Sequence, residues 1–253
     1  MMPPLGPVPD STGRPYNNLL RRLSAADYAL LAPHLGYYEE AGPNDLLYSP
    51  GDDVEIVHFP CGPSLASFLV LNEDGRDVET ILVGREGAVG GIVSEGYLPA
   101  YTRIMVKFAG PFMRLHVGKL DAAKTKSKTL RNVFARYADC LLAQIFQSTA
   151  SNAIHSIEQR TAKWVISAME RTDDAETVPL THEQLATLLG VGRSYTSRVI
   201  QTFKGGRRHR DPARVNPGAQ PRGPAETRLP LQRIRQESFR GSAARRLPDG
   251  GGQ

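Results

Sequence analysis

Short segments in which apolar and polar residues alternate follow one another through the first half of the chain. Turn-forming clusters rich in Gly, Pro, Asn and Asp separate them, for example at 50–51, 72–75 and 84–87. Alternation with a period of two residues, bounded by turn residues, is typical of β-strands. Strands this short and this closely spaced predict a β-roll or barrel. The predicted strands are 45–48, 55–59, 67–71, 78–83, 103–108 and 112–117.

After residue 118 the apolar pattern changes to a helical spacing. A helical stretch is predicted over about 120–149, and from Leu130 to Phe146 its apolar side chains recur every three or four residues, in a stripe wide enough to contact both the β-roll and a second copy of the chain. A stripe of this kind is also compatible with an ordinary core. A further helix is predicted at about 155–171, and a short one near Ser24 and Asp27, which have capping-box spacing. The stripe consists of Leu130, Val133, Phe134, Tyr137, Leu141, Leu142, Ile145 and Phe146.

Two short helices joined by a glycine turn are predicted within 181–203. Thr181 and Gln184 have capping-box spacing and mark the start of the first helix. Gly190 can adopt the left-handed conformation that ends a helix, and the second helix begins near Arg193. This arrangement is a helix-turn-helix, a unit whose second helix lies in the major groove of DNA.

The exposed face of the second helix carries groups suited to the major groove. Arginine can bond guanine bidentately, and serine and tyrosine hydroxyls reach phosphates or base edges. No acidic residue lies between Gly190 and Phe203. A helical hairpin with a central glycine also occurs in proteins that do not bind DNA. The motif alone is therefore compatible both with DNA binding and with a purely structural role. The candidate DNA contacts are Arg193, Ser194, Tyr195, Ser197 and Arg198.

The segment 181–203 resembles the DNA-binding motif of the Crp/Fnr family, the cyclic-AMP receptor and fumarate-nitrate regulators of bacteria. In that family the second helix opens with Arg-x-x-x-x-Arg, which Arg193 and Arg198 match. Ser194 stands where the best-known members have glutamate, so the resemblance does not identify the bases recognised here. The strand-rich part is similar to the family's N-terminal roll, and the resemblance covers roughly 16–203.

The resemblance implies an α+β fold with an N-terminal double-stranded β-helix (jelly-roll) sensor domain, a long dimerisation helix and a C-terminal helix-turn-helix of winged type. It implies a cytoplasmic transcription regulator, not an enzyme, that needs no cofactor. The implied partners are DNA, a second copy of the chain and RNA polymerase. The expected divisions are 1–15 as a disordered leader, 16–118 as the roll, 119–152 as the dimerisation helix, 153–203 as the DNA-binding domain and 204–253 as a basic tail.

Binding of cyclic AMP is not expected. In the nucleotide-binding members a glutamate follows glycine, and an arginine followed by Ser or Thr holds the phosphate. Here Gly90 is followed by Gly91 and Ile92, and Arg103 is followed by Ile104. The effector is therefore left unidentified, and Arg103 remains available for another anion.

The basic charge of the chain belongs to its last fifty residues. Those residues carry 12 Lys and Arg against 4 Asp and Glu, so residues 1–203 carry 19 against 22, and the globular part must bind DNA through a local patch. Rich in Gly and Pro, 204–253 cannot bury enough apolar surface to fold and lacks the two short strands of a wing. It is either a natural arginine-rich arm or the product of a reading-frame slip near Lys204. Read one base later, codons for 208–217 are compatible with a wing sequence.

Other chemistry in the sequence is sparse. Cys61 and Cys140 have no paired spacing, and the family's iron-sulfur sensors need four cysteines, so both are expected to be reduced core residues. The histidines are scattered without metal-ligand spacing, and no metal site is predicted. Two alternatives remain: a small-molecule-binding β-barrel of the cupin type, which would need clustered His and Glu ligands, and a truncated regulator defective in DNA binding.

Overall fold

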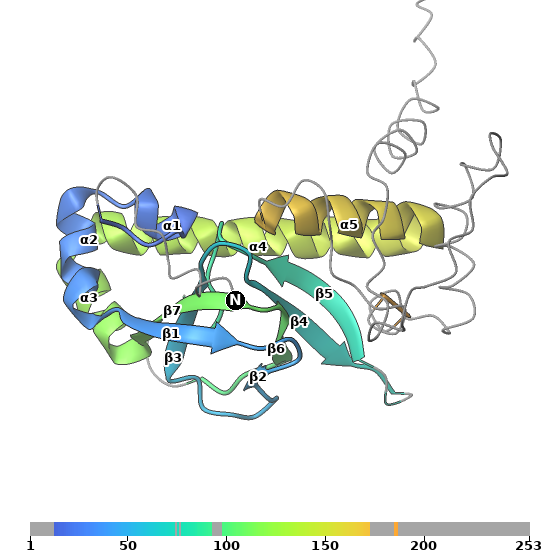
Figure 1. The fold of residues 1–253 in the computed structure, drawn as a ribbon, viewed down its shortest axis with the longest axis horizontal. Coiled ribbons are helices and arrows are strands. Elements are labelled where there is room, and N and C mark those ends of the chain that lie inside the picture. Colours follow the sequence, from blue (N-terminus) through green and yellow to red (C-terminus); the bar gives the residue numbers. More distant parts are fainter. Residues whose placement is uncertain (1–12, 74, 76, 93–97, 173–184, 187–253) are drawn as a thin grey trace, which may run out of the picture.

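The computed structural model describes residues 13–73, 75, 77–92, 98–172 and 185–186. These residues form a β-sandwich followed by long helices (Figure 1). The strands are β1 (Gly36–Ala41), β2 (Leu46–Tyr48), β3 (Ile56–Pro60), β4 (Leu65–Leu71), β5 (Asp77–Val83), β6 (Arg103–Phe108) and β7 (Gly110–His116). The helices are α1 (Asn18–Arg21), α2 (Ala25–Leu31), the 3-10 turn η1 (Ala32–His34), α3 (Val117–Lys126), α4 (Lys128–Ile154) and α5 (Ile157–Thr172).

The strands form two antiparallel sheets. One has the order β1-β7-β3 and the other β2-β6-β4-β5. Side chains from both sheets meet in one core, in which Phe59, Val106 and Phe112 are fully buried and Leu115 is 1% exposed. The alternating segments, which predict a β-roll or barrel, therefore form a sandwich of two sheets.

All six predicted strands are present, with ends displaced by at most two residues. A seventh strand, β1, was not predicted. It lies at the edge of its sheet and pairs only with β7, as in the register Tyr37 to Met113. The run Gly-Tyr-Tyr-Glu-Glu-Ala lacks the apolar alternation of a strand with one face in the core, so its pairing partner, rather than its own pattern, makes it a strand.

The short helix expected near Ser24 is α2. The Ser24 hydroxyl accepts a hydrogen bond from the backbone nitrogen of Asp27 at 3.0 Å, as the capping spacing predicts. Before it, Arg14 and Pro15 belong to the packed structure rather than to a leader. The Arg14 guanidinium donates to the carbonyl oxygens of Arg21 and Leu23 at 2.9 and 2.6 Å.

The expectation of one continuous helix over 120–149 is wrong, because the helix is interrupted at Ser127. The segment forms two helices, α3 and α4. Ser127 is extended, and its hydroxyl accepts from the backbone nitrogen of Leu130 at 3.1 Å, which caps α4. The same hydroxyl and that of Thr129 donate to Asp27 of α2. The break therefore holds three helices together through one buried carboxylate.

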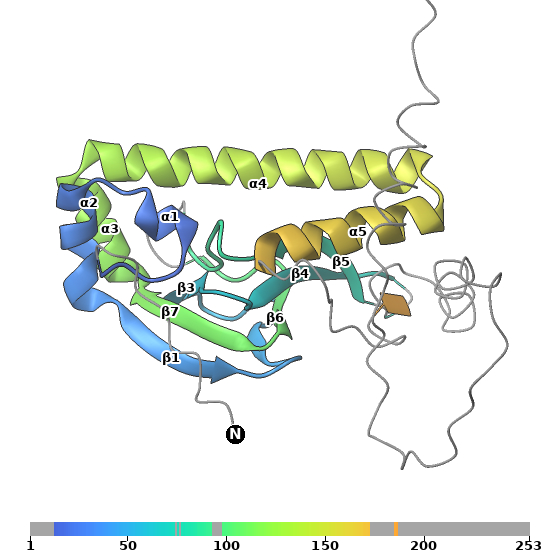
Figure 2. The same cartoon turned by 45° about the horizontal axis from the view of Figure 1, so that its top comes forward.

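Helix α4 lies along the sandwich, and α5 turns back beside its C-terminal half and reaches β4 and β5 (Figures 1 and 2). The predicted helix at 155–171 is thus α5, and its apolar residues Ala162, Val165 and Met169 are buried. Among the described helices, none combines the length and apolar character needed to cross a membrane.

Candidate functional site

The apolar stripe of α4 divides into a buried half and an exposed half. Leu130, Phe134 and Tyr137 are at most 8% exposed and pack against the roll. Further along, Leu142 is 47% exposed and Phe146 is 63% exposed. The stripe is therefore core at its N-terminal end, and its C-terminal end leaves large apolar side chains uncovered in the single chain.

Tyr137 attaches α4 to the loop after β5. Its hydroxyl donates to the carbonyl oxygen of Ala88 and accepts from the backbone nitrogen of the same residue, both at 2.9 Å. A Cβ atom at Gly87 would lie 2.0 Å from this hydroxyl, so only glycine fits there. Burial raises the pKa of Tyr137, which keeps the phenol protonated and able to donate.

A large apolar pocket lies between the roll and α4, with a volume of about 510 Å³. Helix α4 contributes Ala138, Leu141, Leu142 and Ile145, which share one face of the helix. The roll contributes the opposite wall, made by Val54, Phe68, Val70, Thr80, Ile81, Gly90, Gly91, Ile92, Leu98, Pro99, Ala100, Tyr101, Thr102 and Ile104. The sequence does not reveal this site, because its residues come from six separate segments and have no common motif.

Arg103, which lies between the lining residues Thr102 and Ile104, is already engaged in an ion pair. Arg103, which the sequence left available for an anion, donates to Asp77 at 2.5 Å across the sheet. The glycines beside the pocket are explained by packing: Gly90 has φ +106°, and a Cβ there would lie 2.4 Å from the carbonyl oxygen of Ile56. The interpretation of this segment as turns between strands is therefore favoured over a phosphate-binding loop.

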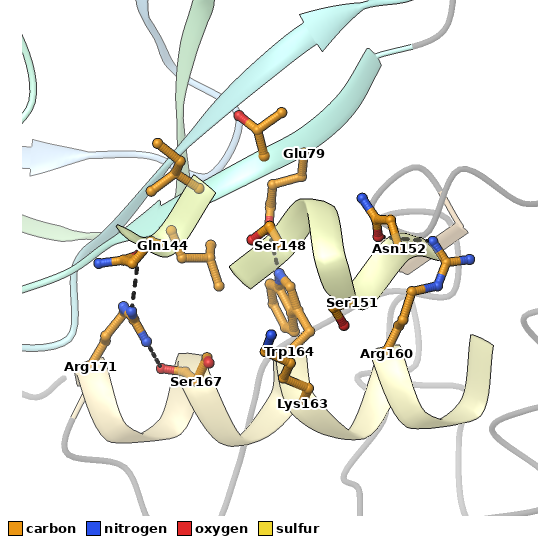
Figure 3. Close-up of a pocket in the computed structure, with 13 residues that line it drawn as sticks. Glu79, Gln144, Ser148, Ser151, Asn152, Arg160, Lys163, Trp164, Ser167 and Arg171 are labelled. Atoms are coloured by element: carbon orange, nitrogen blue, oxygen red, sulfur yellow. Dashed lines mark hydrogen bonds between the residues drawn. The ribbon is translucent and has the colours of Figure 1, made fainter. Parts of the chain in front are cut away.

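A second cleft, which is polar and has a volume of about 110 Å³, lies between β5, α4 and α5 (Figure 3). Arg171 of α5 bridges it, donating to Gln144 of α4 at 3.2 Å and to Glu86 at 2.8 Å. At the other end, Arg160 donates to Asn152 at 3.1 Å. These side chains link α5 to α4 and to the loop after β5.

Glu79 is buried where α5 meets the roll. Its side chain is 4% exposed, its nearest cation is Lys107 at 4.0 Å, and it accepts a hydrogen bond from the indole nitrogen of Trp164. Burial raises the pKa of Glu79 to about 7, although Lys107 and Trp164 act in the opposite direction. The carboxyl group therefore changes charge near neutral pH inside a contact between two parts of the chain.

The predicted DNA contacts lie outside the described residues. These are Arg193, Ser194, Tyr195, Ser197 and Arg198, and their roles remain predictions. In the first helix of the predicted motif, Leu185 is 1% exposed and Ala186 is 7% exposed, in agreement with the apolar and closely packed positions expected there.

The two cysteines differ in their surroundings. Cys61 is buried as expected, and burial raises the pKa of its thiol to about 12. Cys140 is exposed on α4, so the expectation of a core position is wrong there. The lack of a paired spacing, on which that expectation rested, does not tell whether a helix position faces the core or the solvent.

The histidines have separate structural environments. His58 is buried between the rings of Tyr48 and Phe112, and burial lowers its pKa to about 4. His116 caps α3 by accepting from the backbone nitrogen of Gly118 at 3.1 Å, and His155 is hydrogen-bonded to Ser151 at 2.8 Å. Across the described residues, no group of three or more His, Cys, Asp or Glu is placed to hold a metal ion.

Comparison of the whole chain with known proteins gives structural matches only. No protein-family model matches, and no curated protein is similar in sequence. FixK2 from Bradyrhizobium japonicum superposes with a TM-score of 0.62 at 13% identity, covering 80% of this chain and 96% of that one. A putative regulator of the Crp/Fnr family from Eubacterium rectale has a TM-score of 0.62 at 13% identity, covering 88% and 99%.

A third match is a CRP-family transcriptional regulator from Thermus thermophilus, with a TM-score of 0.60 at 14% identity, covering 80% of this chain and 97% of that one. Two of the three, those from Eubacterium rectale and Thermus thermophilus, are described as transcriptional regulators. At this low identity the likeness concerns the fold. The chain has the fold of the Crp/Fnr-family transcription regulators.

Proposed function

We propose that this chain is a homodimeric transcription regulator that binds specific DNA sequences and responds to a signal received at its β-roll. The fold supports this function, because the matched structures include transcription regulators. The helix-turn-helix predicted at 181–203 supplies the DNA-binding element, and the described part supplies a pocket and an apolar surface that the function needs.

The observation that carries the proposal is the exposed apolar end of α4. Leu142, Ile145 and Phe146 are 38–63% exposed on one long helix, next to the helix that leads toward the predicted motif. Large apolar side chains grouped in this way are typical of a surface that a partner covers. A symmetric partner seated on α4 would present two recognition helices, which a two-fold operator with half-sites about 34–36 Å apart requires.

Binding to DNA is tested with an operator selected in vitro from random sequences and a gel-shift titration. If Arg193 contacts a guanine bidentately, Arg193→Ala should lose roughly 1–3 kcal/mol of discrimination at one base pair, about 5- to 150-fold. If it contacts phosphate, affinity should fall on all sequences and the salt dependence should become shallower.

A matched control is Arg207→Ala, which removes the same charge just beyond the predicted helix and should leave base discrimination unchanged. Affinity of Arg193→Ala equal to that of the parent protein on the selected operator would show that Arg193 has neither role. Failure to select any operator would contradict the proposed function itself.

The basic tail, 204–253, is proposed to lie outside the evolved fold, either as a natural arm or as the product of a frame slip near Lys204. Sequencing the coding DNA around Lys204 separates these origins. Deleting 205–253 should leave the dimer intact, and a chain with the alternative frame restored should bind its operator more tightly, because a wing adds contacts to DNA. Slow amide exchange across 212–247 would show a folded tail and contradict this proposal.

A further inference from the structure

We propose that Glu79 is a proton-controlled latch between the β-roll and α5, in which the protonated carboxyl holds α5 on the roll and the ionised carboxylate loosens it. The latch consists of described residues and does not depend on the proposed function. One consequence does rest on that function. Because α5 precedes the predicted DNA-binding motif in the chain, the latch would link pH to operator binding.

Trp164 is the side chain through which α5 meets the carboxyl. Its indole nitrogen donates a hydrogen bond to Glu79 Oε1 (Figure 3), and its ring lies edge-on to Phe108 with centroids 6.3 Å apart. Trp164 is 9% exposed, and the Glu79 side chain is 4% exposed. Helix α5 therefore contributes to the cover of the carboxyl, and moving α5 away would bring the carboxyl into water.

The enclosed carboxyl has too few hydrogen-bond donors to hold a negative charge well. Oε1 accepts from Trp164, whereas Oε2 is buried and has no hydrogen-bond partner. Lys107 of β6 lies 4.0 Å from Oε2 and is itself only 7% exposed. An ionised carboxylate in this place loses its hydration without gaining equivalent hydrogen bonds, and a protonated carboxyl loses much less. The closed arrangement therefore favours the protonated form.

Two cations act against this preference without overcoming it. Within the described part of the chain, Lys107 is the one cation at ion-pair distance from Glu79. Arg171 of α5 acts more weakly and is already paired with Glu86 at 2.8 Å. Strand β4 faces the carboxyl with the Ser67 hydroxyl, which forms no hydrogen bond. From α5, Arg160 and Lys163 also line the cleft, and α4 lines it with the uncharged Gln144, Ser148, Ser151 and Asn152.

Protonation of Glu79 therefore follows pH in the neutral range. With α5 in place, burial raises the pKa of the carboxyl to about 7, although Lys107, Trp164 and Arg171 lower it. With α5 away, water restores the ordinary pKa of 4.5. The seated form binds more protons between these values, so the seating of α5 is strongest below about pH 4.5, weakens as pH rises to about 7 and changes little above.

Trp164 is the only tryptophan of the chain, so its fluorescence reports directly on the latch. Acrylamide quenching of the full-length protein gives the ratio of accessible to enclosed Trp164. Between about pH 5.5 and about pH 8 this ratio should rise at least about tenfold, because pKa values of 4.5 and about 7 require a change of that order in the seating equilibrium. A parent protein quenched equally at both pH values would overturn the proposal.

Glu79→Gln keeps an acceptor for the indole but cannot ionise. At about pH 8 its Trp164 should stay as enclosed as that of the parent at about pH 5.5, because the side chain stays neutral. Glu170→Gln is the matched control, since it removes the same charge from an exposed position of α5 and should respond to pH as the parent does. A rise in Glu79→Gln equal to that of the parent would mean that another group titrates, and the latch would be refuted.

Lys107→Met gives a second route if Glu79→Gln does not fold. Removing the cation at 4.0 Å destabilises the ionised carboxylate, so the midpoint of the quenching change should move to higher pH. A midpoint that stays in place would count against Glu79 as the titrating group. Circular dichroism should be the same at both pH values, and a loss of helix that parallels the quenching would show general unfolding in place of a latch.

Operator binding by the parent and by Glu79→Gln is measured at the same two pH values. The affinity of the parent should change with pH several-fold more than that of Glu79→Gln, because a ligand that prefers one arrangement of α5 responds to its population. Equal pH dependence would overturn the link to regulation. Failure to select any operator would contradict the proposed function and leave the Trp164 result standing, whereas pH-independent Trp164 with intact operator binding would refute the latch alone.

Discussion

The indole nitrogen of Trp164 in α5 donates a hydrogen bond to the carboxyl group of Glu79 in β5, 85 residues earlier in the chain. The Trp164 ring also packs edge-on against Phe108, with centroids 6.3 Å apart. Both contacts hold the helix that leads toward the predicted DNA-binding motif against the sensor roll. Their strength therefore bears on whether that motif moves with the roll or apart from it.

Replacing Trp164 with Phe should destabilise the protein by about 1–3 kcal/mol. Phenylalanine keeps an aromatic ring, although a smaller one, but the buried carboxyl of Glu79 loses its donor, and an unsatisfied buried group costs this amount. Urea unfolding followed by circular dichroism measures the change. Lys163→Gln, at the exposed adjacent position of α5, is the control and should leave the unfolding midpoint where it is. A Trp164→Phe protein as stable as the parent would show that the hydrogen bond contributes nothing.

Glu79 should make stability fall as pH rises through neutrality. Its pKa of about 7 in the folded protein lies above the ordinary 4.5, so the folded chain binds more protons than the unfolded chain between these values. The free energy of unfolding therefore decreases from about pH 4.5 to about pH 7 and stays lower above, by an amount on the order of 1–3 kcal/mol. Glu79→Gln keeps an acceptor for Trp164 and should abolish this decrease.

The control for that measurement is Glu73→Gln, which removes the charge of an exposed glutamate and should retain the decrease. His58 acts in the opposite direction: its folded pKa of about 4 is below the ordinary 6.5, so stability is lost as pH falls through this range. Because His58 is present in both proteins, the difference between parent and Glu79→Gln isolates Glu79. Identical pH profiles for those two proteins would rule out the titration.

Phe146→Glu should convert the dimer to monomers. Phe146 is 63% exposed in the single chain, and a charge placed in a buried subunit contact costs several kcal/mol, so dissociation should rise by roughly a hundredfold or more. Sedimentation equilibrium measures the mass. The neighbouring Gln147→Glu adds the same charge to the same helix and should stay dimeric. A parent protein that is monomeric at micromolar concentration would contradict the proposed dimer.

Leu141 is a poorer position for this test than its place in the apolar stripe suggests. It is only partly exposed, packs against the core and lines the pocket. A charge there would disturb the roll as well as any subunit contact. Phe146 separates the two effects because it is not a lining residue of that pocket.

Tyr137→Phe should lower stability by about 1–3 kcal/mol, because the backbone nitrogen and carbonyl oxygen of Ala88 both lose their partner in a buried position. Gly87→Ala should be more damaging, since its methyl group would overlap the Tyr137 hydroxyl. In the double variant, removal of that hydroxyl should recover part of the loss caused by Gly87→Ala. Losses that simply add would show that the two sites do not interact.

Local patterns were sufficient for much of the fold. The alternating segments predicted six strands because one face of each lies in the core, and the Ser24 cap predicted α2 because a helix start needs an acceptor for its free amides. Edge strand β1 was missed because its pairing with β7 stabilises it more than its own apolar pattern. The break at Ser127 was missed because the apolar stripe begins only at Leu130, so the polar run 124–129 was included in the helix without support from the pattern.

The candidate site could not be predicted from local patterns, because it depends on contacts between residues that are far apart in the sequence. Glu79 is a charged residue in an alternating segment, and nothing in that pattern says that its side chain is 4% exposed. The strand register shifts at Phe68 and Leu69, which pair with Ile81 and Glu79, so Thr80 is an extra residue on β5. A bulge of this kind changes which side chains face inward, and it depends on the partner strand.

The sequence by itself determined six of the strands, helices α2 and α5, the Ser24 cap and the candidate recognition residues, because these depend on neighbours within a few positions. Only the tertiary structure decided which half of the α4 stripe is buried, where the apolar pocket opens and that Arg103 is paired. The physical reason is that helical spacing places Phe134 and Ile145 on the same face of α4, whereas burial requires another element to lie opposite. The roll covers Phe134, which is 1% exposed, and leaves Ile145 38% exposed.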